Sequence, residues 1–216
     1  MKKLSGLLLM VIATFLLTAC GATKIESMDD YTNALNEHDS YTVRLVFKNW
    51  RSNQEYTILG RYQDNIEHMK LTESGSDIPD REIFVVDQGQ TYDIYIPQTQ
   101  TQASIHPDVD KSEFTGSFTD VRLYQFIDPF ALNPEWFTYL DDVDLYVIQS
   151  QYRDDLLRAI MLEDSSPEDF TTFNAQIRFR NNEMHLFIFM ANETDQIEIN
   201  YTVSNIGRTN ITLPRG

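Results

Sequence analysis

The chain has 216 residues, with 17 Lys and Arg against 33 Asp and Glu, so its formal net charge is −16. Such an acidic chain repels phosphate backbones, which excludes nucleic acid as a partner. It also repels anionic lipid headgroups, so a basic patch cannot be what holds it at a membrane. The single cysteine, Cys20, excludes an internal disulfide, and stability must therefore come from packing.

The N-terminus has the three parts of an export signal. Lys2 and Lys3 are followed by an apolar run over residues 7–17, which is too short to span a bilayer core of about 30 Å. Leu17-Thr18-Ala19-Cys20 then resembles the bacterial lipobox. That resemblance implies cleavage before Cys20 and a diacylglycerol on its thiol. An ordinary cleaved signal peptide and an uncleaved anchor remain the alternatives.

The lipobox divides the chain into three parts. Residues 1–19 are expected to be the signal peptide, residues 20–26 a lipidated tether, and residues 27–216 a single domain. Without Lys2 and Lys3 the mature chain carries 15 basic and 33 acidic side chains, a net charge of −18. Two acyl chains on Cys20 would hold it stably on a membrane, facing away from the cytoplasm. Gly21 permits an outer-membrane destination where the cell has one.

The first half of the mature chain alternates apolar and polar residues after one short helix. Ser27 is placed to cap a helix over residues 27–38, with Met28, Tyr31 and Leu35 on its apolar side. From Tyr41 the period becomes two, which predicts a meander of antiparallel strands. The expected strands are 41–48, 55–63, 66–72, 82–87 and 91–97, with a loop at 73–80.

The second half begins with a polar stretch, 98–118, interpreted as a long connection, and an apolar segment at 121–127. Asn133 and Pro134 predict the start of a short helix over 134–140. A strand over 144–151 and a helix over 154–162 follow. The closing meander is expected at 173–180, 183–190 and 196–204, with Asn181-Asn182 as a two-residue hairpin turn and a last strand ending at Leu213-Pro214.

The closing segment resembles the shared end of bacterial lipoprotein-localisation factors and LppX/LprG-type lipoproteins. The residues that carry the likeness are Asn181-Asn182, Asn205-Ile206-Gly207 and Ile211-Thr212-Leu213-Pro214. The resemblance implies an α+β fold: a curved antiparallel sheet, or incomplete β-barrel, with helices covering its open side. Proteins of this kind hold acyl chains or lipidated partners between sheet and helices.

The aromatic residues supply the candidate ligand-lining positions. The chain has 13 Phe, 11 Tyr and 2 Trp, and Phe47, Tyr62, Trp136 and Phe187 are selected as candidates for lining an acyl pocket. For each of them, an ordinary place in the core is the alternative. His38, His68, His106 and His185 are far apart in sequence, and no serine lies in a GxSxG motif. We therefore expect no metal site, no cofactor and no enzymatic activity.

Two functions follow. The first is a non-enzymatic, membrane-anchored lipoprotein of the cell envelope that binds a lipid or another apolar ligand between sheet and helices. The second is a structural or interaction lipoprotein with a filled core, which binds an envelope protein through its acidic surface or a strand edge. An apolar cavity of several hundred Å³ would favour the first, and a solid core the second.

Overall fold

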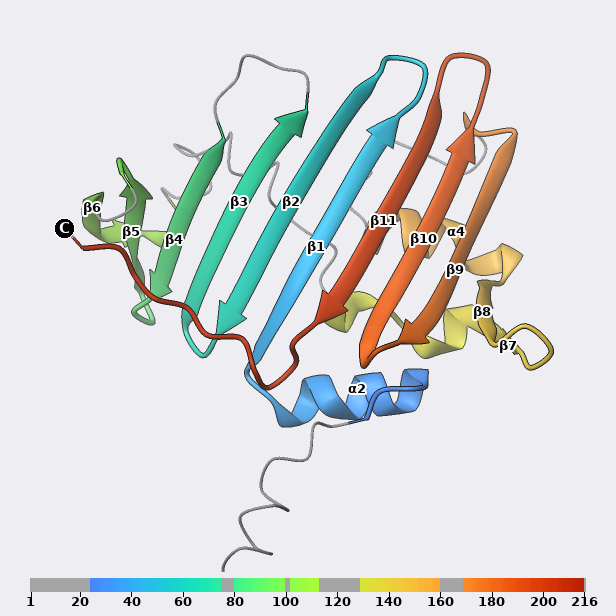
Figure 1. The fold of residues 1–216 in the computed structure, drawn as a ribbon, viewed down its shortest axis with the longest axis horizontal. Coiled ribbons are helices and arrows are strands. Elements are labelled where there is room, and N and C mark those ends of the chain that lie inside the picture. Colours follow the sequence, from blue (N-terminus) through green and yellow to red (C-terminus); the bar gives the residue numbers. More distant parts are fainter. Residues whose placement is uncertain (1–23, 75–79, 100–101, 113–128, 160–168, 216) are drawn as a thin grey trace, which may run out of the picture.

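The computed structural model describes residues 24–74, 80–99, 102–112, 129–159 and 169–215. Cys20, the signal peptide and the apolar segment at 121–127 lie outside these ranges. The described strands form one antiparallel sheet, shown in Figure 1. They are β1 (Ser40–Asn49), β2 (Gln54–Gln63), β3 (Ile66–Ser74), β4 (Arg81–Asp87), β5 (Thr91–Pro97), β6 (Ala103–Asp110), β7 (Phe137–Leu140), β8 (Leu145–Ile148), β9 (Thr172–Arg180), β10 (Glu183–Ala191) and β11 (Gln196–Ser204).

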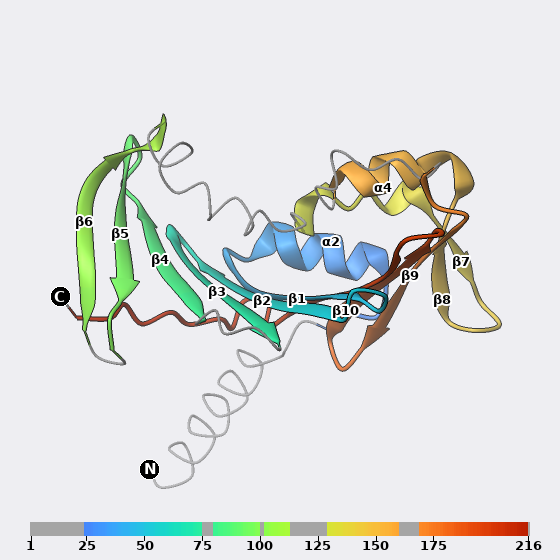
Figure 2. The same cartoon turned by 90° about the horizontal axis from the view of Figure 1, so that it is seen from above.

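The sheet joins the two predicted meanders through one central pair of strands. Its order is β6-β5-β4-β3-β2-β1-β11-β10-β9-β8-β7, so β1 and β11 are neighbours although they are the first and last strands along the chain. Val43 is paired with Val203 and Leu45 with Tyr201. Figure 2 shows that β6 and β7 stand at opposite ends of a curved sheet. The predicted curved, unclosed antiparallel sheet is therefore confirmed.

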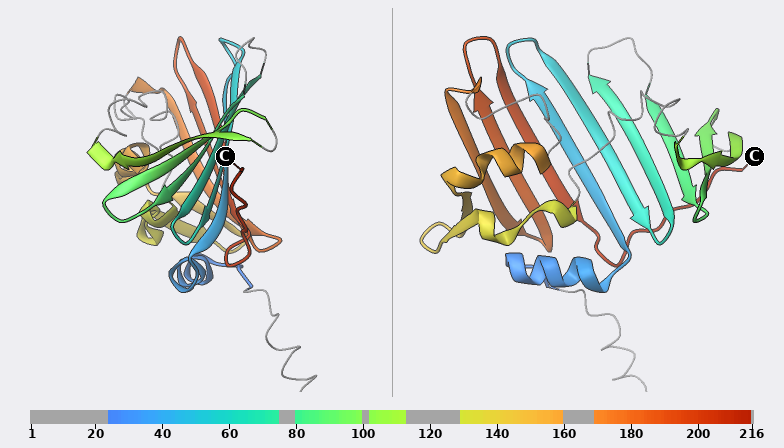
Figure 3. Two further views of the ribbon diagram at one scale, coloured as in Figure 1. Left: turned by 90° about the vertical axis from the view of Figure 1, so that its left-hand side faces the viewer. Right: turned by 180° about the vertical axis from the view of Figure 1, so that it is seen from behind.

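Two short α-helices lie on the concave face. They are α2 (Met28–Glu37) and α4 (Arg153–Ala159), and Figure 2 and Figure 3 show both on the side toward which the sheet curls. Ser27 caps α2 as predicted, because its hydroxyl accepts a hydrogen bond from the Asp30 N–H at 3.1 Å. Within the described ranges, no helix has both the length and the apolar character that a bilayer crossing requires.

The core cluster joins residues of these helices and of the strands β9, β10 and β11, and it extends to Val43, Met69, Leu71, Ile83, Val85 and Ile94 on β1 and β3 to β5. Alternate residues of β10 are fully buried, and they meet the inward residues of β9 and β11 across the pairing. From α2, Tyr31 and Leu35 join this cluster, and from α4, Leu156 and Leu157. The period-two pattern of the closing meander therefore reflects one buried face. Asn181 and Asn182 have φ values of 56° and 62°, as a type I′ hairpin turn requires.

Three expectations were wrong, and in the first two tertiary pairing decided the local structure. The helix expected over 134–140 is only the 3₁₀ turn η3 (Pro134–Trp136), after which β7 pairs with β8. Aromatic and β-branched residues favour a strand there. The connection over 98–118 contains β6, which pairs with β5. The predicted last strand is a tail without a ladder, apart from an isolated bridge between Gln102 and Arg215.

The C-terminal tail crosses the outer face of the sheet, in front of the strands in Figure 1. It begins at Gly207, whose φ of 73° suits glycine. A Cβ at this position would stand 2.9 Å from two atoms of the His38 ring. Side chains of the outer face then hold the tail: Thr42 Oγ1 lies 2.8 Å from Thr209 Oγ1, and Gln63 Oε1 accepts the Ile211 N–H at 2.7 Å.

Candidate ligand-binding site

The concave face has two parts that differ in how deeply their side chains are buried. Over β9, β10 and β11 the inward residues are buried: Ile188 and Tyr201 expose none of their surface. We call these strands' inward residues the packed half. Over β1 and β2, Val43 and Gly60 are buried, and six other inward residues remain half-buried. These are Tyr41, Leu45, Phe47, Tyr56, Ile58 and Tyr62, which we call the aromatic half.

The aromatic half is an ordered apolar surface. The rings of Tyr41 and Tyr62 stack with their centroids 4.6 Å apart, and those of Phe47 and Tyr56 lie 5.9 Å apart. These pairs face each other because β1 and β2 are in register, with Tyr41 opposite Tyr62 and Phe47 opposite Tyr56. The strand pairing thus places four aromatic rings on one face as one stacked pair and one tilted pair, with part of each side chain open to solvent.

A cavity of about 690 Å³ opens at one end of this surface. It lies between the end of α2, the turn from β2 to β3, and the 3₁₀ turn η2 (Pro129–Ala131). Tyr41 and Tyr62 belong to both the aromatic half and the cavity wall. Phe130, which is 53% exposed, meets Tyr41 edge-on at 6.1 Å. The volume is in the range of cavities that hold small ligands.

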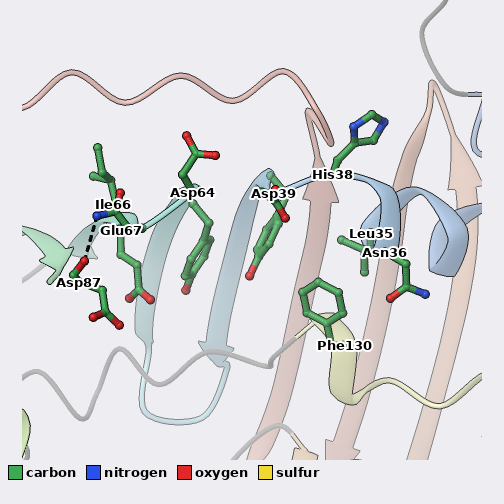
Figure 4. Close-up of a pocket in the computed structure, with 12 residues that line it drawn as sticks. Leu35, Asn36, His38, Asp39, Asp64, Ile66, Glu67, Asp87 and Phe130 are labelled. Atoms are coloured by element: carbon green, nitrogen blue, oxygen red, sulfur yellow. Dashed lines mark hydrogen bonds between the residues drawn. The ribbon is translucent and has the colours of Figure 1, made fainter. Parts of the chain in front are cut away.

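Four acidic residues also contribute to the cavity wall. Figure 4 shows the carboxylates of Asp87, Glu67, Asp64 and Asp39 following one another, with Phe130 beyond them. The pKa of Glu67 is raised above its usual range, mainly because neighbouring atoms displace bulk water and secondly because Asp87 is also negative. By surface area, however, Glu67 is exposed to solvent.

Asp87 is stabilised in its charged form. The Lys111 ammonium donates to both of its oxygens, at 2.8 and 2.7 Å, and the Gly89 N–H donates at 2.7 Å. These hydrogen bonds hold the pKa of Asp87 below its usual range, and the bond from Lys111 has the largest effect. Lys111 also stands 4.7 Å from the centroid of the Tyr92 ring, so a carboxylate and an aromatic ring share one ammonium ion here.

The structure brings together some of the predicted lining residues. Phe47 and Tyr62 lie on the aromatic half, and Tyr62 also lines the cavity. Trp136 lies in η3, half-buried against the core. Phe187 lies on the other face of the sheet, because the inward residues of β10 are Met184, Leu186, Ile188 and Met190. The alternation of inward and outward residues along β10 could have excluded Phe187 as a lining residue. Sequence reasoning missed Tyr41, Phe130, Glu67 and Asp87.

Of the four histidines, only His68 is buried. His68 is buried on the outer face, where its Nε2 lies 2.7 Å from Glu82 Oε1 and its ring stacks on Phe84 at 4.2 Å. Burial lowers the pKa of His68, against the opposing effect of Glu82. In the described ranges, no three His, Cys, Asp or Glu side chains are grouped as a metal ion would require.

The site belongs to a curved, open antiparallel sheet whose concave face is buried over β9 to β11 and again at Ile83, Val85 and Ile94 of β4 and β5, with half-buried residues on β1 and β2 between these regions. No protein-family model matches the chain, and no curated protein matches it significantly.

Proposed function

We propose that the protein is a non-enzymatic lipoprotein of the cell envelope, anchored by a diacylglycerol on Cys20, that binds a lipid or another apolar ligand on the aromatic half. In this proposal the sheet is one wall of the binding space, and the helices α2 and α4 cover the rest of its open side. The observation that carries it is the half-buried aromatic surface, continuous with a cavity of about 690 Å³.

The anchor is supported by the lipobox and by the start of the folded chain. Ile25 is 3% exposed and belongs to the core, and its N–H donates to Asn182 Oδ1 at 3.4 Å. Only Gly21 to Lys24 then separate Cys20 from a residue fixed in the fold. A fully extended chain covers at most about 3.5 Å per residue, so Ile25 would stay within about 18 Å of the lipidated thiol. The domain would therefore sit close to the bilayer.

The ligand is supported by the energetics of the exposed surface. Each methylene that moves from water into an apolar environment contributes about 0.8 kcal/mol. Eight methylenes laid across the aromatic half would contribute about 6 kcal/mol before the cost of association, which is estimated at about 4 kcal/mol or more. A longer chain contributes more, in proportion to the methylenes that it buries. The inward face of β1 and β2 is where that burial is still incomplete.

Lipid analysis of the purified full-length protein tests this function. Mass spectrometry of its organic extract is expected to find a lipid in a fixed ratio to protein, beyond the lipid on Cys20. Ile58 and Leu59 are neighbours on β2, both half-buried, on opposite faces. Ile58→Glu should remove the extracted lipid, and Leu59→Glu should retain it. Wild-type protein without lipid, or equal loss in both variants, would contradict the proposal.

A second function, binding of an envelope protein, is favoured by one other surface. Tyr139, Leu140 and Val143 are 45%, 40% and 50% exposed in the hairpin between β7 and β8, at one free edge of the sheet. Crosslinking in intact cells would test it. A defined partner lost with Val143→Asp but retained with Ile58→Glu would favour this function, whereas an unchanged crosslinking pattern would oppose it.

A further inference from the structure

The outer face of the sheet carries a surplus of positive charge, although the whole chain is strongly acidic. Across β9, β10, β11, β1 and β2 its outward side chains include five Lys or Arg and three Glu, so the local formal charge is +2 against −16 for the chain. We propose that this face lies against a bilayer surface that contains anionic lipid headgroups. The inference rests on the proposed lipid anchor and adds an orientation of the anchored domain.

Most of the positive charge on this face is not used within the fold. Four arginines have no hydrogen bond or ion pair with the residues that the structure describes, and we call them the outer arginines: Arg44, Arg61, Arg178 and Arg180. The Nε of Arg178 is buried without a hydrogen-bond partner there. The fifth cation, Lys48, is paired with Glu55 at 3.5 Å. Four guanidinium groups therefore remain for an external anion, and guanidinium matches the geometry of a phosphate group.

The strand pairing gathers the outer arginines into one area. Arg178 stands opposite His185, His185 opposite Thr202, and Thr202 opposite Arg44. Neighbouring strands lie about 4.8 Å apart, so this row across four strands is about 14 Å long. Arg61 is diagonal to Arg44 on the next strand. An extended anionic surface can meet the whole row, whereas a single small anion would reach only one or two of these guanidinium groups.

The tether enters the fold beside the same area, which makes a bilayer the anionic surface within reach. The Ile25 N–H donates to Asn182 Oδ1, and Asn182 follows Arg180 by two residues, in the turn from β9 to β10. A small hollow at this point is lined by Ile25, by both asparagines of the turn and by Arg208 of the C-terminal tail. Because Ile25 stays within about 18 Å of the lipidated Cys20, the anchor holds this end of the sheet near the headgroups.

The acidity of the chain as a whole favours the same orientation. The anchor supplies the attachment, so the outer arginines only have to select which face meets the bilayer. Charges more than about 8 Å apart are largely screened at physiological ionic strength, so the face in contact decides the interaction. The helices carry exposed acidic side chains such as Asp29 and Asp154, and they lie on the concave side. The outer face would be attracted and the concave face repelled, so the aromatic half would open away from the bilayer.

Fluorescence quenching in vesicles tests this orientation. Cys20 is the only cysteine and its thiol carries the anchor, so a fluorophore can be attached at one engineered cysteine. Asn200→Cys places it on the outer face, and Asp154→Cys places it on α4. The lipid-modified, full-length protein is placed in vesicles of phosphatidylcholine or of a mixture with about one third phosphatidylglycerol, both with a nitroxide-headgroup lipid as quencher. Quenching at Asn200→Cys should be about threefold stronger in the anionic vesicles, because each arginine near the surface favours contact.

Paired substitutions identify the charges responsible. Arg44→Gln with Arg61→Gln should make the quenching at Asn200→Cys equal in the two kinds of vesicle. Arg51→Gln with Arg158→Gln is the matched control, because it removes the same charge from the loop after β1 and from α4. This control should retain the preference for anionic vesicles.

The outcomes separate the inference from the anchor on which it rests. Equal quenching of the wild-type arginine set in neutral and anionic vesicles would overturn the inference and leave the anchor standing. Stronger quenching at Asp154→Cys than at Asn200→Cys, or an equal effect of the two paired substitutions, would also overturn it. Failure of the full-length protein to remain with either kind of vesicle would overturn both the proposed anchor and the inference.

Discussion

Two isoleucines on the same face of the sheet allow the packed and aromatic halves to be compared directly. Ile188 exposes none of its surface and lies between Ala175 of β9 and Ile199 of β11. Ile58 is half-buried and lies between Leu45 of β1 and Leu71 of β3. Replacing either with alanine removes the same three carbon atoms. The difference in unfolding free energy between the variants therefore reports the difference in burial.

For Ile188→Ala, three methylene equivalents at about 0.8 kcal/mol each, plus the cost of the cavity, give about 3 to 4 kcal/mol. In a chain of this size that lowers Tm by about 6 to 16 °C. Ile58→Ala loses only the buried part of the same transfer energy, so we expect less than about 1.5 kcal/mol. Thermal unfolding followed by circular dichroism measures both variants under identical conditions.

The effect of an added ligand should rank the two variants in the opposite order, with the larger loss in Ile58→Ala. An apolar ligand that binds only the folded state raises Tm in proportion to its occupancy. The rise with octyl glucoside should be smaller in Ile58→Ala than in wild type, and unchanged in Ile188→Ala. Equal destabilisation by the two substitutions would show that the aromatic half is packed like the rest of the core. That result would refute the reasoning that leads to a binding surface.

Three further changes have defined outcomes. Cys20→Ser should move the protein out of the membrane fraction or leave its signal uncleaved, and unchanged lipid labelling would contradict the anchor. Glu67→Gln should raise Tm at pH 7 and have no effect near pH 3. Because the pKa of Glu67 is raised in the folded protein, its charged carboxylate opposes folding once the pH exceeds the pKa that Glu67 has in the unfolded chain. An equal gain in Tm at pH 7 and near pH 3 would contradict this. Gly207→Ala should cost about 1 to 3 kcal/mol in urea unfolding, since its φ is 73° and its Cβ would meet His38; a cost below about 0.5 kcal/mol would contradict it.

Local chemistry made much of the sheet predictable. The alternation of apolar and polar residues identified strands on both sides of the central β1–β11 pair. The turn at Asn181-Asn182 fixed the register of β9 with β10. Residues 137–140 were misread because Asn133 and Pro134 start a helical turn that the pairing with β8 then ends. β6 lacks a strong apolar pattern, since its central residues are exposed, and only its pairing with β5 makes it a strand.

The site was less predictable than the sheet. Phe47 and Tyr62 could be found because they belong to strands with one apolar face. The cavity could not, because Tyr41, Glu67 and Phe130 come from segments far apart in sequence and meet only in the folded protein. The opposite placement of Phe187 shows the limit of choosing aromatic residues by type, since a shift of one residue along a strand changes the face.

Photocrosslinking tests the central claim, that the aromatic half binds an apolar chain, most directly. Cells expressing the full-length protein would be fed a fatty acid carrying a diazirine at mid-chain, irradiated, and the protein digested for mass spectrometry. We predict adducts on peptides from β1 and β2, lost with Ile58→Glu and retained with Leu59→Glu. Adducts confined to Cys20, or spread evenly over both faces of the sheet, would contradict the account.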